Sequence, residues 1–224
     1  TQGVDLDVSG LSKLRSLSLV QRLRRRQRFV TLGPDNTYIV RSGLIAVEVT
    51  PIAGTRSIIE LLYPGDVVVP SMQAPIAELG LTATTPAELW RLTSHNFMQE
   101  LHRDNALTDL VFHRLNAQRA RMQLHVAILA GLSSEPRVVA LLIEVASRLG
   151  VRDSRGVSFE MPLSRTEMAE YLALNADTLS RIMSRLTSTN IIDRSGRAQM
   201  TVLDWDGLLA LCPMAQTVRA LHSQ

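Results

Sequence analysis

The pattern of hydrophobic and polar positions changes along the chain and divides it into three regions. Between about Arg28 and Leu92, short apolar runs such as residues 44–49 and 56–62 alternate with Gly and Pro every 8–12 residues or so. Turn residues at this spacing are typical of a small antiparallel barrel or sandwich. Before them, residues 11–23 predict a short helix with a basic segment at its end. A run of arginines such as this one is more typical of a solvated face than of a nucleic-acid contact.

The second region, from about Ser94 to Leu132, has no Pro or Gly before Gly131, which predicts a helical region that is long for a single helix. Six of its residues are spaced 4, 3, 4, 3 and 4 apart, as in a helix that pairs with a second copy of itself. These seam residues are Val111, Leu115, Gln118, Met122, His125 and Leu129. The two polar ones cost stability but can fix the register of the pair. An amphipathic helix that packs on its own domain is the alternative interpretation.

The third region starts at Leu132 and predicts a series of short elements. A helix is expected up to about Leu149, where Gly150 ends it, and a polar loop follows. Residues 164–173 and 175–189 predict two short helices joined by a tight turn. Residues 191–203 then predict a hairpin with Gly at its turn. Two helices followed by a β-hairpin are the outline of a winged helix-turn-helix.

Composition excludes several classes of protein. The 224 residues are 46% hydrophobic and 4% aromatic, with 24 Lys+Arg against 21 Asp+Glu, which excludes a disordered chain, collagen and a highly basic nucleic-acid coat protein. The single cysteine, Cys212, cannot form an intramolecular disulfide, a Cys-only zinc site or an iron–sulfur cluster by itself. The longest apolar stretches, residues 126–132 and 138–146, are too short to span a membrane. With no signal-peptide pattern at the start, we expect a soluble cytoplasmic protein without a membrane partner.

The segment from Leu163 to Leu186 carries the chemistry. Its apolar residues can pack two short helices together and are Met168, Tyr171, Leu172, Leu174, Leu179, Ile182 and Leu186. The outer face of the second helix is then left with Ala176, Asp177, Ser180, Arg181 and Ser184. Short or hydrogen-bonding side chains there allow a helix to enter the major groove. Because Arg can bond guanine and a carboxylate can accept from cytosine, Asp177 and Arg181 could read a G·C pair; an ordinary ion pair between them is the alternative.

This segment, the hairpin after it and the long helix before it resemble the cyclic AMP receptor protein / fumarate-nitrate reduction regulator (CRP/FNR) family. The stretches Ser42-Gly43-Leu44-Ile45-Ala46-Val47 and Leu62-Tyr63-Pro64-Gly65-Asp66 are similar to loops of the family's barrel. The resemblance implies an α+β fold with an N-terminal antiparallel β-barrel of the cupin-like jelly-roll type, a long dimerisation helix and a C-terminal winged helix-turn-helix. We expect these parts to span residues 1–101, 102–131 and 132–224.

The family's recognition helix typically reads Glu-x-x-Ser-Arg or Glu-x-x-Gly-Arg, and here the stretch is Asp177-Thr178-Leu179-Ser180-Arg181. Ser in this position resembles the FNR branch, whose half-sites read TTGAT. The resemblance implies that Arg181 contacts the G, Ser180 an outer T, and Asp177 the cytosine paired with that G. The expected phosphate contacts lie at the helix starts, on the second helix and in the wing: Ser164, Arg165, Thr166, Asn175, Thr178, Arg185, Ser195 and Arg197.

Two residues depart from the family pattern. Asp177 is one methylene shorter than the usual Glu, which would weaken discrimination at that step by roughly 1–3 kcal/mol if its base contact is lost. Ala173 stands where the family usually has Gly in the turn. If Ala173 has a positive φ, the strain is roughly 1–2 kcal/mol.

The sensory part lacks the known effector sites of the family. Between Arg56 and Arg91 there is no arginine that could pair with a cyclic phosphate, as the cyclic-nucleotide cassette requires. The FNR-type cluster cysteines are absent, and none of the five histidines falls in a haem-attachment motif. We therefore expect no cofactor and read Cys212 as a small buried hydrophobe, with a redox-sensing thiol as the alternative.

The sequence thus favours a homodimeric, sequence-specific DNA-binding transcription regulator that acts on double-stranded pseudo-palindromic DNA and contacts RNA polymerase. A ligand- or haem-binding sensor is the alternative. We do not expect an enzyme, because no metalloprotease, nucleophile-elbow or P-loop motif is present. The DNA footprint is expected to be local, since four arginines (181, 185, 194 and 197) meet one acid, Asp193, across helix and wing.

Overall fold

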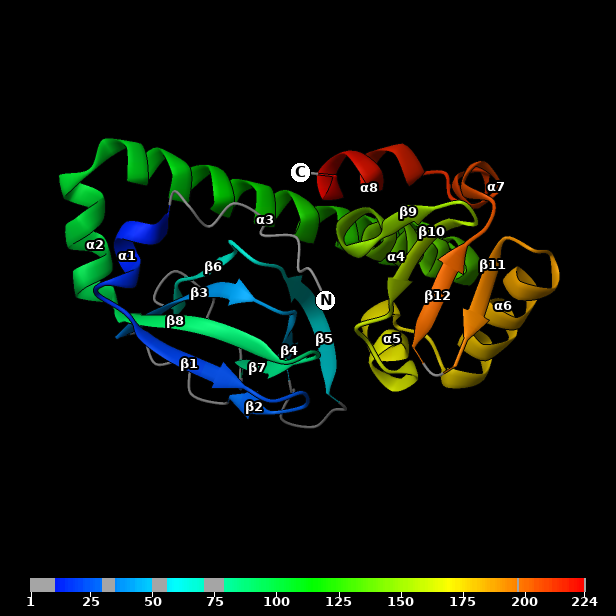
Figure 1. The fold of residues 1–224 in the computed structure, drawn as a ribbon, viewed down its shortest axis with the longest axis horizontal. Helices are drawn as coiled ribbons and strands as arrows, with labels where there is room; N and C mark the ends of the chain where they lie inside the picture. Colours follow the sequence, from blue (N-terminus) through cyan, green and yellow to red (C-terminus); the bar gives the residue numbers. More distant parts are fainter. Residues whose placement is uncertain (1–10, 30–34, 50–55, 71–78, 197, 224) are drawn as a thin grey trace. The chain divides into compact units, whose positions relative to one another are not determined.

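A computed structural model describes residues 11–29, 35–49, 56–70, 79–196 and 198–223 of the chain (Figure 1). The chain forms two compact units, residues 1–119 and 120–224, and the boundary between them falls inside one long helix.

The first unit is built on two four-stranded antiparallel sheets. One has the strand order β1 (Leu19–Leu23), β8 (Ala87–Thr93), β3 (Asn36–Ser42) and β6 (Val67–Val68). The other has the order β2 (Arg28–Phe29), β7 (Leu79–Ala83), β4 (Ile45–Val49) and β5 (Ser57–Leu62). Two facing antiparallel sheets agree with the expected jelly roll, and β4 and β5 confirm the strands predicted from the apolar runs.

Alternation along the strands of the first sheet produces two separate cores. Tyr38, Val40 and Leu89 point to one side and pack with residues of the second sheet such as Ile45 and Leu62. The residues next to these on β3 and β8 point to the other side of the sheet, because side chains alternate across a strand. That side is covered by three helices and contains Ile39, Trp90, Leu92, Leu14, Phe97, Leu107 and Val111.

Gly43 is required for the tight turn between β3 and β4. Its φ is +81°, and a Cβ atom at this position would lie 2.4 Å from the carbonyl oxygen of Pro86. Only glycine satisfies both conditions, so the Ser42-Gly43 pair that resembles the family's loop has a structural reason here.

The prediction of a helix over residues 11–23 is wrong. Helix α1 covers only Ser12–Arg15, and residues 19–23 form strand β1, which pairs with residues 87–91 of β8. A short apolar run does not distinguish a strand from a helix by periodicity alone, and the open edge of the sheet beside β8 decides the outcome.

The helical region predicted from Ser94 is divided into two helices at Asp104. Helix α2 (Ser94–Arg103) ends there, because Asp104 has φ −134° and ψ 100°, and helix α3 (Asn105–Gly131) begins. The Asp104 carboxylate accepts a hydrogen bond of 3.1 Å from the backbone N–H of Leu107, as a residue that caps a helix start does. The expected dimerisation segment 102–131 therefore contains this break near its beginning.

The second unit contains the predicted helices and hairpin, with additional elements. Helices α4 (Ser134–Leu149), α5 (Arg165–Leu172) and α6 (Ala176–Ser188) confirm the prediction, as do strands β11 (Ile192–Ser195) and β12 (Gln199–Val202). The stretch after Gly150, predicted as a polar loop, instead forms strands β9 (Val151–Asp153) and β10 (Gly156–Glu160). These join the hairpin in a sheet of order β11-β12-β10-β9.

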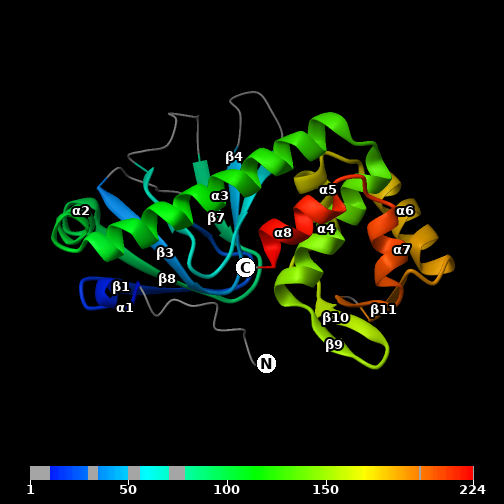
Figure 2. The same ribbon diagram turned by 90° about the horizontal axis from the view of Figure 1, so that it is seen from above.

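Two C-terminal helices, α7 (Trp205–Ala210) and α8 (Ala215–His222), were not expected from the sequence. Helix α8 packs along α4, as both Figure 1 and Figure 2 show. The apolar stretch Val138–Ile143 of α4 is buried on every side, so α4 is the central helix of this unit.

Candidate nucleic-acid interface

Helix α5 begins with a reciprocal pair of hydrogen bonds. The Ser164 hydroxyl accepts from the backbone N–H of Glu167 at 3.3 Å, and the Glu167 carboxylate accepts from the backbone N–H of Ser164 at 2.6 Å. This capping box satisfies two backbone donors that a helix start leaves unpaired. It leaves Arg165 and Thr166 exposed in the first turn of α5, two of the expected phosphate-binding residues.

The turn between α5 and α6 has Ala173 in the left-handed region, with φ 51° and ψ 47°. The backbone N–H of Leu174 donates to the carbonyl of Ala169 at 2.9 Å, which is the long bond of a Schellman-type helix end. The positive φ that the family's glycine implies is thus present with Ala in its place.

Helix α6 begins at an Asn cap and has one buried and one exposed side. The Asn175 side-chain oxygen accepts from the backbone N–H of Thr178 at 2.7 Å. On the inner side the buried residues are Leu179, Ile182, Met183 and Leu186, of which Met183 was not anticipated. The exposed residues of the outer side are Ala176, Asp177, Arg181, Ser184 and Arg185, while Ser180 is half-buried. The division of the helix into two faces follows the predicted pattern.

Asp177 and Arg181 do not form the surface ion pair that was the alternative interpretation. Within the part of the chain that the structure describes, neither side chain has a hydrogen bond or ion pair with another residue. The hydrogen-bonding groups of both side chains face the solvent, one helical turn apart on α6. A pair of charged residues in this state can bind a polar ligand without first breaking an internal contact.

The remaining expected phosphate-binding residues have different surroundings. Ser195 is exposed at the end of β11, next to Gly196 with its φ of +69°. Arg197 lies outside the described residues. Arg185 is exposed but engaged, because its guanidinium pairs with the Glu135 carboxylate at 2.5 Å. Glu135 could not be predicted as its partner from the sequence, because nothing in the local pattern links the start of α4 to the last part of α6.

The structure separates the six predicted seam residues of α3 into two groups. Val111 lies in the helix-covered core of the first unit, and Gln118 and His125 are buried as well. Leu115 and Leu129 are half-buried, and Met122 is exposed. Large exposed apolar side chains one position away from the buried ones are Phe112 and Val126. At two of the predicted seam positions, 111 and 125, the exposed apolar side chain is therefore that of the next residue, Phe112 or Val126.

His125 is held within the second unit by an aromatic contact. Its imidazole stacks on the Tyr171 ring of α5, with centroids 3.9 Å apart and planes at 7°. Burial lowers the pKa of His125 from 6.5 to about 4, so its ring is neutral at physiological pH. Its buried Nε2 atom has no hydrogen-bond partner.

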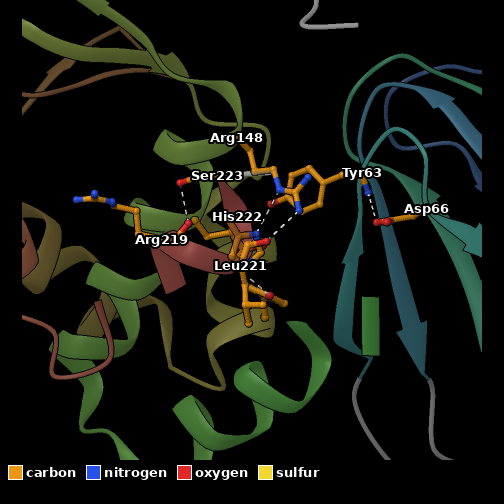
Figure 3. A network of polar contacts seen from close by, with 9 residues as sticks. Tyr63, Asp66, Arg148, Arg219, Leu221, His222 and Ser223 are labelled. Atoms are coloured by element: carbon orange, nitrogen blue, oxygen red, sulfur yellow. Dashed lines mark hydrogen bonds and ion pairs between the residues drawn. The ribbon is translucent and has the colours of Figure 1, made fainter. Parts of the chain in front are cut away.

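A buried polar cluster continues from Tyr171 to the C-terminal helix. The Tyr171 hydroxyl donates to Glu144 at 3.3 Å, and the Arg148 guanidinium donates to His222 at 3.4 Å and to the Leu221 carbonyl at 3.3 Å. Figure 3 shows Arg148, Leu221 and His222 together. Burial, with the positive charges of Arg148 and Arg121, lowers the pKa of His222 to about 3. None of these partners was anticipated, because each contact joins residues far apart in sequence.

Cys212 and Asp66, two residues that the sequence singled out, are both engaged in holding the fold. Burial raises the pKa of the Cys212 thiol, which makes it a poor nucleophile at neutral pH. In the first unit, Asp66 accepts a hydrogen bond of 2.8 Å from the backbone N–H of Tyr63 and fixes the Tyr63-Pro64-Gly65-Asp66 turn (Figure 3). The carboxylate in this cassette-like stretch therefore serves the turn itself.

A model of the Crp-like helix-turn-helix domain matches residues 136–211. The chain is 28% identical over 213 residues to the transcriptional activator protein FnrL of Cereibacter sphaeroides, covering 91% of this chain and 84% of that protein. It is 24% identical over 219 residues to the nitrogen fixation regulation protein FixK of Rhizobium meliloti, covering 94% of this chain and 95% of that protein. Among solved structures, FixK2 from Bradyrhizobium japonicum shares the fold with a TM-score of 0.76 at 21% identity, over 87% of this chain and 97% of that one.

The capped helix pair, the exposed face of α6 and the adjoining hairpin define a winged helix-turn-helix DNA-binding regulator. Residues 136–211 form a Crp-like helix-turn-helix domain, and over most of its length the chain is similar to regulators of the FNR and FixK type. The named relatives are regulators and not enzymes. In the described ranges, no helix has both the length and the apolar character needed to cross a bilayer.

Proposed function

We propose that this regulator binds as a homodimer to a pseudo-palindrome of TTGAT-type half-sites and reads each half-site with helix α6. The observation that carries the proposal is the pair of exposed, internally unpartnered charges Asp177 and Arg181 on that helix. The family's base-reading positions coincide with Asp177, Ser180 and Arg181. Arg181 donates to guanine, and Asp177 accepts from the cytosine of the same base pair.

Phosphate contacts are proposed for residues around α6. Ser164, Arg165 and Thr166 at the start of α5, Asn175 and Thr178 at the start of α6, and Ser195 and Arg197 of the wing supply donors to the DNA backbone. Arg165 and Thr166 support the proposal because they are exposed. The backbone N–H groups that remain unpaired at a helix start carry partial positive charge and favour an anionic ligand. The cationic and hydroxyl side chains beside them add further hydrogen-bond donors.

Dimerisation is proposed to use helix α3. In the single chain, Val111, Gln118 and His125 are buried, so we assign the contact to the exposed or half-buried apolar residues of the helix. These are Phe112, Leu115, Met122, Val126 and Leu129. Their spacings of 3, 7, 4 and 3 keep them on one stripe of the helix. Two protomers joined along α3 would present two α6 helices to half-sites one helical turn apart.

We divide the chain accordingly into a sensory part, residues 1–101, a dimerisation helix, 102–131, and a DNA-binding part, 132–224. The regulator acts in the cytoplasm, where the bacterial chromosome lies, and it contacts RNA polymerase when bound near a promoter.

Selection of bound sequences from random double-stranded DNA tests the function. Enrichment of TTGAT-N4-ATCAA or a close variant is the expected result. Enrichment of an unrelated motif would contradict the assigned half-site, and recovery of no motif would contradict sequence-specific binding. The visible spectrum of the same preparation tests the alternative, because a Soret band would indicate a haem-binding sensor.

A further inference from the structure

Helix α6 carries two exposed arginines with different electrostatic surroundings. Arg181 has no partner within the described chain, whereas Arg185, one turn further along, contacts the Glu135 carboxylate at 2.5 Å. The Glu135 side chain is 28% exposed and that of Arg185 56% exposed, so the pair lies at the surface, within reach of a ligand on α6.

Glu135 lies in the first turn of α4, and Arg185 lies in the last part of α6. The contact is therefore a tertiary one between two helices that pack against each other. Between residues 181 and 197 the sequence contains four arginines and one acid. The fold adds a second acid, Glu135, next to one of these arginines.

A guanidinium paired with a carboxylate contributes little net charge to an approaching DNA strand. To bind a phosphate, Arg185 must either leave Glu135 or share its donors, and in both cases the carboxylate stays near the phosphate and repels it. A phosphate contact made by a free arginine releases condensed counterions, whereas one made by a neutralised arginine releases fewer.

We propose that Glu135 is a positioning residue that restrains DNA binding: its carboxylate holds the Arg185 guanidinium and competes with DNA phosphates for it. This inference rests on the proposed DNA-binding function and refines one expected phosphate contact. Because phosphate contacts carry no sequence information, Glu135 lowers the affinity for operator and non-operator DNA by the same factor and leaves their ratio unchanged.

The test compares the full-length wild type with three variants, Glu135→Gln, Arg185→Gln and the double variant. Binding to the selected operator and to a scrambled duplex is measured by fluorescence anisotropy between 50 and 300 mM salt. Asp206→Asn is the control, because it removes an exposed acid from α7 and changes the net charge by the same amount.

Glu135→Gln is expected to tighten binding to both duplexes about three- to tenfold at low salt. The slope of log K against log salt should steepen by about 0.9, the value for one added phosphate contact on duplex DNA. In the double variant the slope should return to that of the wild type, because Arg185 is the group that Glu135 releases. Asp206→Asn should leave the slope unchanged.

An unchanged salt slope in Glu135→Gln would overturn the inference while leaving the DNA-binding function intact. So would a steeper slope that persists in the double variant, since a cation other than Arg185 would then be responsible. Failure of the wild type to prefer the selected operator over the scrambled duplex would instead contradict the proposed function itself. Matching thermal melting curves for the variants would show that the changes in binding do not come from loss of folding.

Discussion

The imidazole of His125 and the phenol of Tyr171 stack face to face, with their centroids 3.9 Å apart. His125 belongs to the long helix α3 and Tyr171 to α5, the first helix of the helix-turn-helix. The contact therefore joins the proposed dimerisation helix to the proposed DNA-binding elements within the second unit. Tyr171 also donates to Glu144 of α4, so this one side chain of α5 contacts both α3 and α4.

Acidification is expected to destabilise the second unit through His125. Burial lowers the pKa of His125 to about 4 in the folded chain, whereas an unfolded chain has the ordinary value of 6.5. The unfolded state therefore binds more protons below pH 6.5, and the stability that is complete above this pH falls as the pH decreases towards 4. The loss from His125 is on the order of 2 kcal/mol at pH 5. Urea unfolding at pH 7.5, 6 and 5 measures it.

His125→Phe is the matched variant for this prediction, because a phenyl ring can keep the stack without a titrating nitrogen. It should lose less stability than the wild type between pH 7.5 and 5, although His222, with its pKa of about 3, still contributes a decrease in both proteins. An equal loss in both proteins would show that His125 is not responsible.

The two contacts of Tyr171 can be separated by substitution. Tyr171→Phe keeps the stack on His125 and removes the hydroxyl that donates to Glu144, at an expected cost of about 1 kcal/mol in the free energy of unfolding. Tyr171→Ala removes the ring as well and should cost about 3–5 kcal/mol, as for other buried aromatics. Chemical denaturation of both variants measures the difference. If Phe cost as much as Ala, the hydroxyl and not the stack would dominate.

Ala173→Gly is expected to stabilise the chain by up to about 1 kcal/mol. The φ of 51° at Ala173 strains an L-residue and not glycine, and this gain exceeds the added entropy of glycine in the unfolded state. Ala169→Gly, inside helix α5, is the control and should destabilise by about 1 kcal/mol or more. The midpoints of urea unfolding compare the two. A destabilised Ala173→Gly would show that the turn does not strain Ala173.

Cys212 should react slowly with a thiol reagent in the folded protein. The residue is buried, and burial raises the pKa of its thiol, so little thiolate is accessible at pH 7.5. Ellman's reagent should modify it at least tenfold faster in 6 M guanidinium chloride. Rapid modification of the native protein would revive the redox-sensing alternative.

Local signals in the sequence were sufficient for the helix-turn-helix and its wing. The apolar spacing over residues 164–189 indicated the two helices, and Gly196 indicated the wing turn; the capping bonds of Ser164 and Asn175, which the structure adds, are equally local. Residues 19–23 carry no such local signal, because five residues with mixed polarity fit a helix or an edge strand equally, and only the pairing with β8 decides between them.

Contacts between distant residues could not be predicted from one sequence. The heptad spacing identified α3 as a long helix with an apolar face. It did not show that His125 would stack on Tyr171 or that Val111 would be buried in the core of the first unit. In the same way, the arginine count across α6 and the wing did not include Glu135. Periodicity reports which residues share a face, and the partner of that face is set by the tertiary fold.

Binding of Arg181→Ala and Arg165→Ala to the operator and to a scrambled duplex at fixed salt tests the central claim most directly. If Arg181 reads a base and Arg165 a phosphate, Arg181→Ala loses about 1–3 kcal/mol of operator preference, whereas Arg165→Ala weakens both duplexes alike and keeps the preference. Loss of preference in both variants to the same extent, or in neither, would contradict the assignment of α6 as the recognition helix.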